Sequence, residues 1–226
     1  MMREDFGSFL ANKKEATGEC QFLASAARKQ GKRSLAIALQ DAANIIEAAA
    51  FAEAIALPLN RFVTIHFEAG GITDQVKATG KLAKLMGDWL RVNSASFAYV
   101  GVRETGEAKG EHVHLLMHVP AALRGRFNRR QPGWIRKMGA ARKVRVTYSR
   151  PVGRFYYHPG TDAEAREQYL VNLQVAVGYL LKGTDPAALE RLGLSRQEAG
   201  GELTGKRCFH SANIGRAARS RAGLAF

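Results

Sequence analysis

The chain has 226 residues, with 34 Lys or Arg against 20 Asp or Glu, so its formal net charge is +14. Its 46% hydrophobic and 24% charged residues exclude disordered and collagen-like classes, and its length suits one domain with an appendage or two small domains. The positive charge predicts a polyanionic partner.

The N-terminal part predicts a helical appendage over residues 1–57. Its most apolar stretch, residues 34–59, is interrupted by charges such as Asp41 and Glu47, which are too costly at the centre of a membrane span. We therefore expect an Ala-rich helix over residues 34–57 that does not enter a membrane. The first residues lack the apolar core of a signal peptide.

The middle of the chain alternates strand and helix patterns. Branched and aromatic residues predict strands and helical spacing predicts helices, in this order: strand 61–68, helix 72–92, strands 96–104 and 112–119, a short helix, strand 143–149 and helix 162–183. After the first helix the order is β-α-β-β-α-β-α. It resembles an α+β, ferredoxin-like or RRM-like antiparallel sheet with helices on one face. We expect one domain over residues 58–200 and a basic tail over residues 201–226.

A forty-residue segment, residues 121–160, concentrates the charge, with eleven Lys or Arg and no acidic residue. Solvated faces usually mix both signs, so the segment predicts an anion-binding surface. Its aromatic residues, interleaved with the cations, suit a single nucleic-acid strand, although Trp134 is expected in the core. The candidate phosphate contacts are Arg124, Arg126, Arg129, Arg130, Arg136, Lys137, Arg142, Lys143 and Arg145.

Three histidines fall on the predicted strand 112–119. Strand side chains alternate between faces, so His112, His114 and His118 point to one face. Two imidazoles two residues apart can converge on a metal or a phosphate, although a packed or solvent-facing pair has the same pattern. His118 and His66 can line the same cleft or be packed in the structure.

The loop between residues 104 and 112 indicates a hairpin. If the strands pair symmetrically about it, Glu104 lies opposite His112 and on the same face. One carboxylate and two imidazoles would then form a three-ligand site for a divalent cation, with positions left for a substrate oxygen. A carboxylate that merely solvates the hairpin end is the alternative.

Tyr179 and Lys182 stand three residues apart on the last long helix, so they share a face. A phenol is a poor nucleophile at neutral pH unless a cation or metal stabilises the developing phenolate, and Lys182 could help in this. A tyrosine packed on the sheet and a lysine near a helix C-terminus are the ordinary explanation of such a pair.

Taken in order, "FVTIHF", a Glu eight residues before "HVH", and "YLLK" resemble the three motifs of the HUH endonuclease superfamily, in particular rolling-circle replication initiators of bacterial plasmids or phages. The tail "GKRCFHSANIGRAAR" is also similar to such initiators, and the resemblance covers residues 61–215. It implies Glu104, His112 and His114 as ligands of Mg²⁺ or Mn²⁺, Tyr179 as nucleophile and Lys182 as its helper.

The resemblance implies a site-specific nickase that acts on single-stranded or hairpin origin DNA. A 5′-phosphotyrosine intermediate and a free 3′-hydroxyl would form, and a host helicase and polymerase would be partners, since no helicase domain is present. The helix has one candidate tyrosine and not a closely spaced pair, because Tyr169 lies ten residues earlier on a different turn. This favours the single-tyrosine class, with Tyr156 and Tyr157 as less rigidly held alternatives. "GGELTGKR" mimics a P-loop, but Arg207 stands where Ser or Thr is required.

Other functions stay open at this point. A non-catalytic nucleic-acid-binding module would have the same sheet and basic surface, and an HUH transposase or relaxase would use the same chemistry. A two-histidine, one-carboxylate iron oxygenase would leave the basic segment unexplained. Cys20 and Cys208 lie too far apart in sequence for a disulfide framework, so we expect a bacterial cytoplasmic protein.

Overall fold

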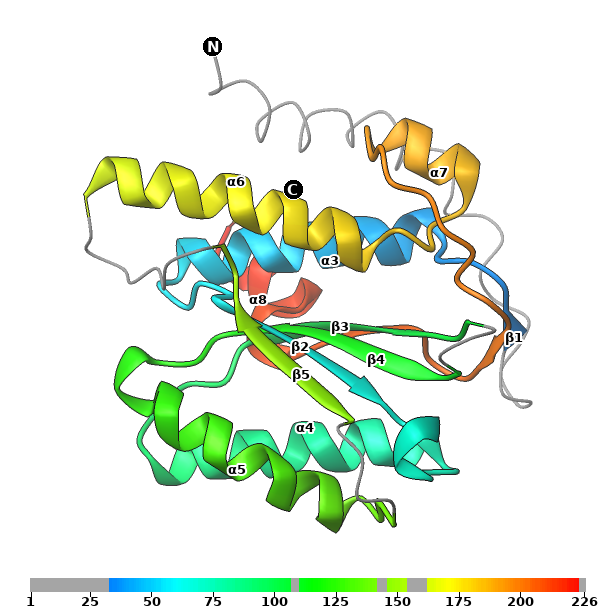
Figure 1. The fold of residues 1–226 in the computed structure, drawn as a ribbon. Helices are drawn as coiled ribbons and strands as arrows, with labels where there is room; N and C mark the ends of the chain where they lie inside the picture. Colours follow the sequence, from blue (N-terminus) through cyan, green and yellow to red (C-terminus); the bar gives the residue numbers. More distant parts are fainter. Residues whose placement is uncertain (1–32, 107–109, 142–145, 154–161, 224–226) are drawn as a thin grey trace.

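The computed structural model describes residues 33–106, 110–141, 146–153 and 162–223. The helices in these ranges are α3 (Leu39–Ala54), α4 (Gln75–Val92), α5 (Arg124–Lys137), α6 (Ala163–Leu180), α7 (Pro186–Arg191) and α8 (Arg216–Arg221). The strands are β1 (Arg33–Ser34), β2 (Arg61–His66), β3 (Tyr99–Glu104), β4 (His112–Met117), β5 (Thr147–Pro151), β6 (Leu203–Thr204) and β7 (Cys208–His210) (Figure 1).

The centre of the fold is a five-stranded antiparallel sheet with the strand order β5-β2-β4-β3-β7. The predicted α+β class with an antiparallel sheet is therefore confirmed. The hairpin register is also the expected one, because Glu104 on β3 pairs directly with His112 on β4. On the other side of β4, His114 pairs with Thr64 of β2.

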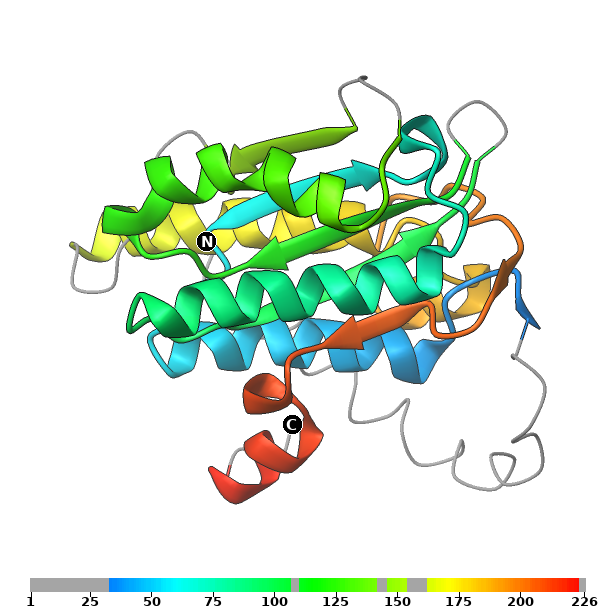
Figure 2. The ribbon, with the colours of Figure 1, turned by 90° about the horizontal axis from the view of Figure 1, so that it is seen from below.

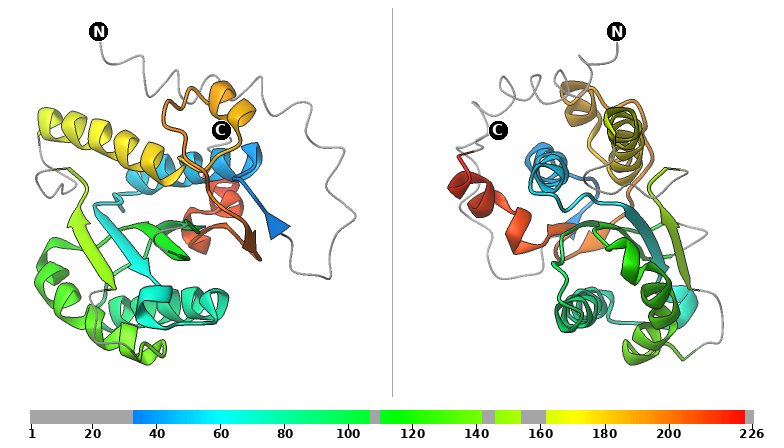
Figure 3. Two further views of the ribbon diagram at one scale, coloured as in Figure 1. Left: turned by 45° about the vertical axis from the view of Figure 1, so that its right-hand side comes forward. Right: turned by 90° about the vertical axis from the view of Figure 1, so that its left-hand side faces the viewer.

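Helices cover both faces of the sheet, whereas the sequence predicted them on one face. Helices α3 and α6 lie on one face and α4 and α5 on the other (Figures 1 and 3). The reason is that both alternating sets of strand residues are apolar. Phe62 and Leu116 pack in the core beneath α3 and α6, while Val63 and Leu115 pack in the core with α4 and α5. A second layer of helices is needed to bury the second set.

Neither end of the described chain stands apart from the sheet. Helix α3, which we expected in an appendage, buries most of its alanines and isoleucines in the core. Strand β7 falls in the expected basic tail, yet it pairs with β3 at the sheet edge, next to α3 and α8 (Figure 2). Arg219 of α8 is buried and donates to Glu47 of α3 with Nη2–Oε2 at 2.6 Å. Part of the charge assigned to the tail therefore lies inside the fold.

The two longest helices, α4 and α6, begin at side-chain caps that the sequence encodes. Asp74 accepts a hydrogen bond from the backbone N–H of Lys77 at the start of α4, and Asp162 does the same for Ala165 at the start of α6. Both helices agree with the expected ranges to within a few residues. Within the described ranges, no helix has the length and apolar character that crossing a membrane requires.

Candidate metal centre and its tyrosine

Glu104, His112 and His114 come together at the end of the β3–β4 hairpin where the loop joins the two strands. Each offers one ligand atom, and these atoms lie within 4.8 Å of one another. Nε2 of His112 and Nε2 of His114 are each 3.5 Å from Oε2 of Glu104. All three side chains are buried, and they point from the sheet face that carries α6. The expected convergence of one carboxylate and two imidazoles is therefore present.

Two further hydrogen bonds set the orientation of the imidazoles. Nδ1 of His112 donates to the carbonyl oxygen of Gly110 at 2.9 Å, which places Nε2 on the side of the ring that faces Glu104. Nδ1 of His114 lies 2.8 Å from Oγ1 of Thr64, its cross-strand neighbour. Metal-binding histidines typically hold their second ring nitrogen in this way.

The three residues fit a divalent cation. Among the described residues, Nε2 of His114 and Oε1 of Glu104 are buried without a hydrogen-bond partner, which is costly unless another group satisfies them. Ligand atoms at about 2.1 Å from a shared ion are at most about 4.2 Å apart, so a small inward movement suffices. Two imidazoles and a carboxylate suit a divalent metal ion and leave coordination positions open.

The electrostatics of the site keep the carboxylate charged. Burial on its own would raise the pKa of Glu104, but the imidazoles of His112 and His114 and the ammonium of Lys182 outweigh it and hold this pKa far below its usual range. Burial lowers the pKa of His114, although Glu104 opposes the shift. Both directions favour the protonation states that bind a cation.

Tyr179 and Lys182 lie on the same side of the sheet as the triad. The ring centroid of Tyr179 is 5.3 Å from that of His114 and 5.7 Å from that of Phe62, in edge-to-face contacts. Lys182 follows the end of α6, and its Nζ donates to Oε2 of Glu104 at 2.5 Å. The same Nζ is 5.3 Å from the Tyr179 ring centroid. Lys182 thus contacts both the predicted nucleophile and a predicted ligand.

Two residues of the site were missed by the sequence analysis. The guanidinium of Arg196 lies over the Tyr179 ring, with Cζ 4.7 Å from its centroid, and Arg196 also donates to Glu198. Glu198 in turn forms an ion pair with Lys182 at 3.1 Å. Both residues come from the extended segment between α7 and β6, where no periodic pattern or motif marks them.

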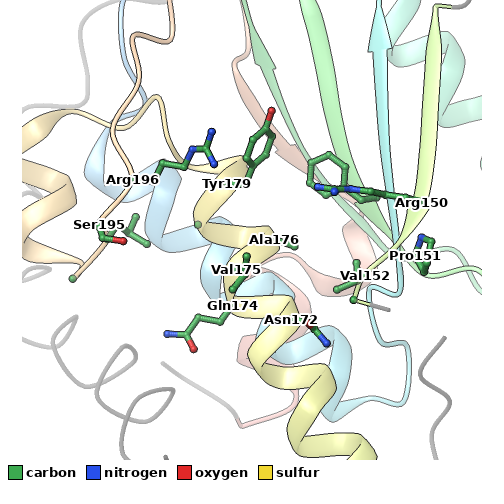
Figure 4. A pocket seen from close by; sticks show the side chains of 15 residues that line it. Arg150, Pro151, Val152, Asn172, Gln174, Val175, Ala176, Tyr179, Ser195 and Arg196 are labelled. Atoms are coloured by element: carbon green, nitrogen blue, oxygen red, sulfur yellow. The ribbon is translucent and has the colours of Figure 1, made fainter. Parts of the chain in front are cut away.

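Two adjoining pockets meet at the tyrosine. One, of about 720 Å³, contains the triad, Thr64, His66, Tyr148 and Lys182. The other, of about 840 Å³, runs along α6 from Asn172 to Tyr179, reaches Arg196 in the segment after α7 and faces the edge strand β5 (Figure 4). Phe62, Arg150 and Tyr179 line both pockets. We call these two adjoining pockets, which aromatic rings and cations line, the groove at Tyr179.

Apart from Arg150, which lines both pockets, the described cations of the basic segment lie elsewhere. Those on α5, which are Arg124, Arg126, Arg129, Arg130, Arg136 and Lys137, are exposed on the sheet face opposite the triad. Arg142, Lys143 and Arg145 and the alternative nucleophiles Tyr156 and Tyr157 lie outside the described residues. Of the other histidines, His66 lines the triad pocket, and Nδ1 of buried His118 donates to the carbonyl oxygen of Pro58.

No protein-family model, curated protein or solved structure matches this chain.

Proposed function

We propose that this protein nicks and rejoins single-stranded DNA through attack of Tyr179 on a phosphodiester, in the manner of an HUH replication initiator. The observation that carries the proposal is the contact between a tyrosine and a buried two-histidine, one-carboxylate cluster, with ring centroids of Tyr179 and His114 at 5.3 Å. Lys182 and Arg196 beside Tyr179 also support the proposal, because a phenol needs nearby positive charge to act as a nucleophile at neutral pH.

In the proposed step, the phenol oxygen of Tyr179 forms a bond to the phosphorus of the scissile phosphate, and the bond from phosphorus to the 3′ oxygen breaks. The phenol proton passes to solvent in the groove, and the departing 3′ oxygen takes up a proton. The products are a 5′-phosphotyrosine and a free 3′-hydroxyl that can prime synthesis. Because the intermediate keeps a phosphoester bond, a second hydroxyl can reverse the reaction and join the strand.

The remaining residues have distinct parts in this proposal. A Mg²⁺ or Mn²⁺ ion held by Glu104, His112 and His114 would offset negative charge on the phosphate oxygens. Lys182 and Arg196 each place a positive charge close to the phenol ring, and Lys182 also fixes the carboxylate of Glu104. The groove has rings on which bases can stack and Arg150 for a phosphate, which suits an unpaired strand.

The test is the formation of a covalent protein–DNA adduct. The purified full chain is incubated with Mn²⁺ and short DNA strands that have a randomised centre and a label at the 3′ end. We expect an adduct that survives denaturation and carries the 3′ label, because the tyrosine retains the downstream fragment. Tyr179→Phe should abolish the adduct. Tyr169→Phe, which changes a buried tyrosine ten residues earlier on the same helix, should still form it.

The alternatives predict different results. A non-catalytic binding module would retain the strands without any adduct. A transposase or relaxase would give the same adduct, and the sequence of the retained strands, which would resemble a transposon end or a transfer origin, separates these from a replication initiator. Oxygen consumption with Fe²⁺ and no adduct would favour an oxygenase.

A further inference from the structure

The exposed face of α5 is a separate basic surface. Arg126, Arg129, Arg130, Arg136 and Lys137 are exposed, and at 3.6 residues per turn they fall within about a third of the helix circumference. The helix has no acidic side chain that would neutralise them. The five cations extend over about 16 Å of helix axis at 1.5 Å per residue. We call them the α5 stripe.

The α5 stripe faces away from the metal centre. Helix α5 packs through Phe127 and Trp134 on the core that contains Val113 and Leu115 of β4. His112 and His114 alternate with those two residues, so their side chains leave β4 on the opposite face. Figures 1 and 3 show α5 and α6 on opposite sides of the sheet. The part of a DNA strand that is cut at Tyr179 therefore cannot contact the α5 stripe at the same time.

The composition of the stripe suits a duplex rather than a single strand. The aromatic residues of α5 itself are buried, so the helix offers no ring on which an unpaired base can stack. The ring beside the stripe, Trp89 of α4, is half-buried and already lies under Arg126, whose Cζ is 5.9 Å from its centroid. The groove on the other face has such rings in Tyr148 and Tyr179. Duplex DNA carries about one charge per 1.7 Å of its axis, so phosphates are dense enough to meet all five cations.

A membrane surface fits the stripe less well. A helix that binds a bilayer from the side inserts its apolar face among the lipids. The apolar face of α5, including Phe127, Trp134 and Ile135, is already used in the core. The exposed face of α5 therefore offers a partner only positive charge, without apolar side chains that could insert into a bilayer.

We propose that the α5 stripe binds the phosphate backbone of duplex DNA while the groove at Tyr179 holds an unpaired strand of the same substrate. The protein would then straddle a junction between double-stranded and single-stranded DNA. The inference rests on the proposed function for the choice of DNA as ligand, and the duplex surface is distinct from the cutting site.

The first test is a competition experiment with full-length Tyr179→Phe, which binds DNA without cutting it. A labelled single strand is bound first, and an unlabelled blunt duplex is then added while fluorescence anisotropy is recorded. We expect the duplex to join the complex and raise the anisotropy. Displacement of the strand mole for mole by the duplex would overturn the proposal, as would equal binding by anionic lipid vesicles or by duplex RNA.

The second test removes charge at two matched places. Arg126→Gln/Arg129→Gln/Arg130→Gln should weaken duplex binding by about tenfold or more and lower the slope of log K against log salt by about three, since each phosphate contact contributes about 0.9. Single-strand affinity should fall less. The control Lys206→Gln/Arg216→Gln/Arg221→Gln removes three other exposed cations and should change duplex binding less. Equal losses in both triple variants would refute a site on α5.

The two proposals fail in different ways. If duplex and single strand bind together but no covalent adduct ever forms, the cutting function is wrong and the duplex surface stands. If the adduct forms but the duplex competes with the single strand, the cutting function stands and the separate duplex surface on α5 is wrong.

Discussion

Nζ of Lys182 donates to Oε2 of Glu104 at 2.5 Å, so a lysine just beyond the tyrosine helix is tied to the carboxylate of the metal-ligand candidates. The ammonium holds the carboxylate in place, but it also places a positive charge beside any cation that binds there. Oε1 of Glu104, which makes no hydrogen bond to the described residues, stays available to an ion. Lys182 is therefore a link between the tyrosine and the metal centre.

Replacing Lys182 with Met should separate these two roles. Loss of one positive charge next to the site should tighten Mn²⁺ binding by about tenfold, which equals about 1.4 kcal/mol, while adduct formation slows because the phenol loses a cation. Titration calorimetry with Mn²⁺ measures the first effect and adduct kinetics the second. Weaker Mn²⁺ binding in Lys182→Met would show that the lysine supports the ligands rather than competing with the ion.

Thr64 is expected to tune metal affinity without being a ligand. Thr64→Val removes the partner of His114 Nδ1 and keeps the side-chain shape, so Mn²⁺ affinity should fall by about ten- to a hundredfold. The stabilisation of the fold by Mn²⁺, read as a shift in Tm, should shrink in parallel. Thr64→Ser retains the hydroxyl and serves as the control. An unchanged affinity in Thr64→Val would remove the support for a metal held by His114.

Arg196 is expected to act on the tyrosine and not on the metal. Arg196→Met removes the cation stacked on the Tyr179 ring, so adduct formation should slow by about tenfold or more, in line with the loss of a group that stabilises developing charge. Mn²⁺ affinity should stay within about twofold of the wild type, since electrostatic screening weakens the effect of an exposed charge on the site. A large loss of Mn²⁺ affinity would place Arg196 in the metal site instead.

The ion pair between Arg219 and Glu47 is expected to make the C-terminal segment part of the folding unit. Both side chains are buried, so Arg219→Met removes the positive partner of a buried carboxylate and should destabilise the protein by about 3 to 5 kcal/mol in urea denaturation. Arg216→Met on the same helix changes an exposed residue and should cost less than about 0.5 kcal/mol. Similar small effects in both variants would mean that α8 is dispensable to the fold.

Stability of the metal-free protein should fall as the pH is lowered. Burial lowers the pKa of both His114 and His210 from the ordinary value of 6.5. Below that pH the unfolded chain takes up protons that the folded chain does not, so acidification lowers the free energy of the unfolded state relative to the folded state. Urea midpoints in a chelating buffer, from about pH 8 to about pH 5, should decline, and His210→Gln should flatten the decline. A higher midpoint at the acid end would contradict the burial effect.

The sequence predicted the local structure and the metal-ligand candidates well. Strand alternation and the symmetry of the hairpin loop were enough to pair Glu104 with His112, because register follows from loop length. Which sheet face a helix covers depends on tertiary packing, so the position of α5 opposite the triad was not predictable from its charge. Arg196 and Glu198 reach the site from an irregular segment, where contact depends on the path of the chain and not on any pattern.

The most direct measurement is the site of covalent attachment in the protein–DNA adduct. After reaction with Mn²⁺ and single-stranded DNA, the adduct is trimmed with nuclease and its peptides are analysed by mass spectrometry. They should carry a nucleotide joined through its 5′ phosphate to Tyr179, and none should be found when a chelator is present. A nucleotide attached to another residue, or the absence of any adduct under conditions in which the strand is bound, would contradict the assignment of Tyr179 as the nucleophile.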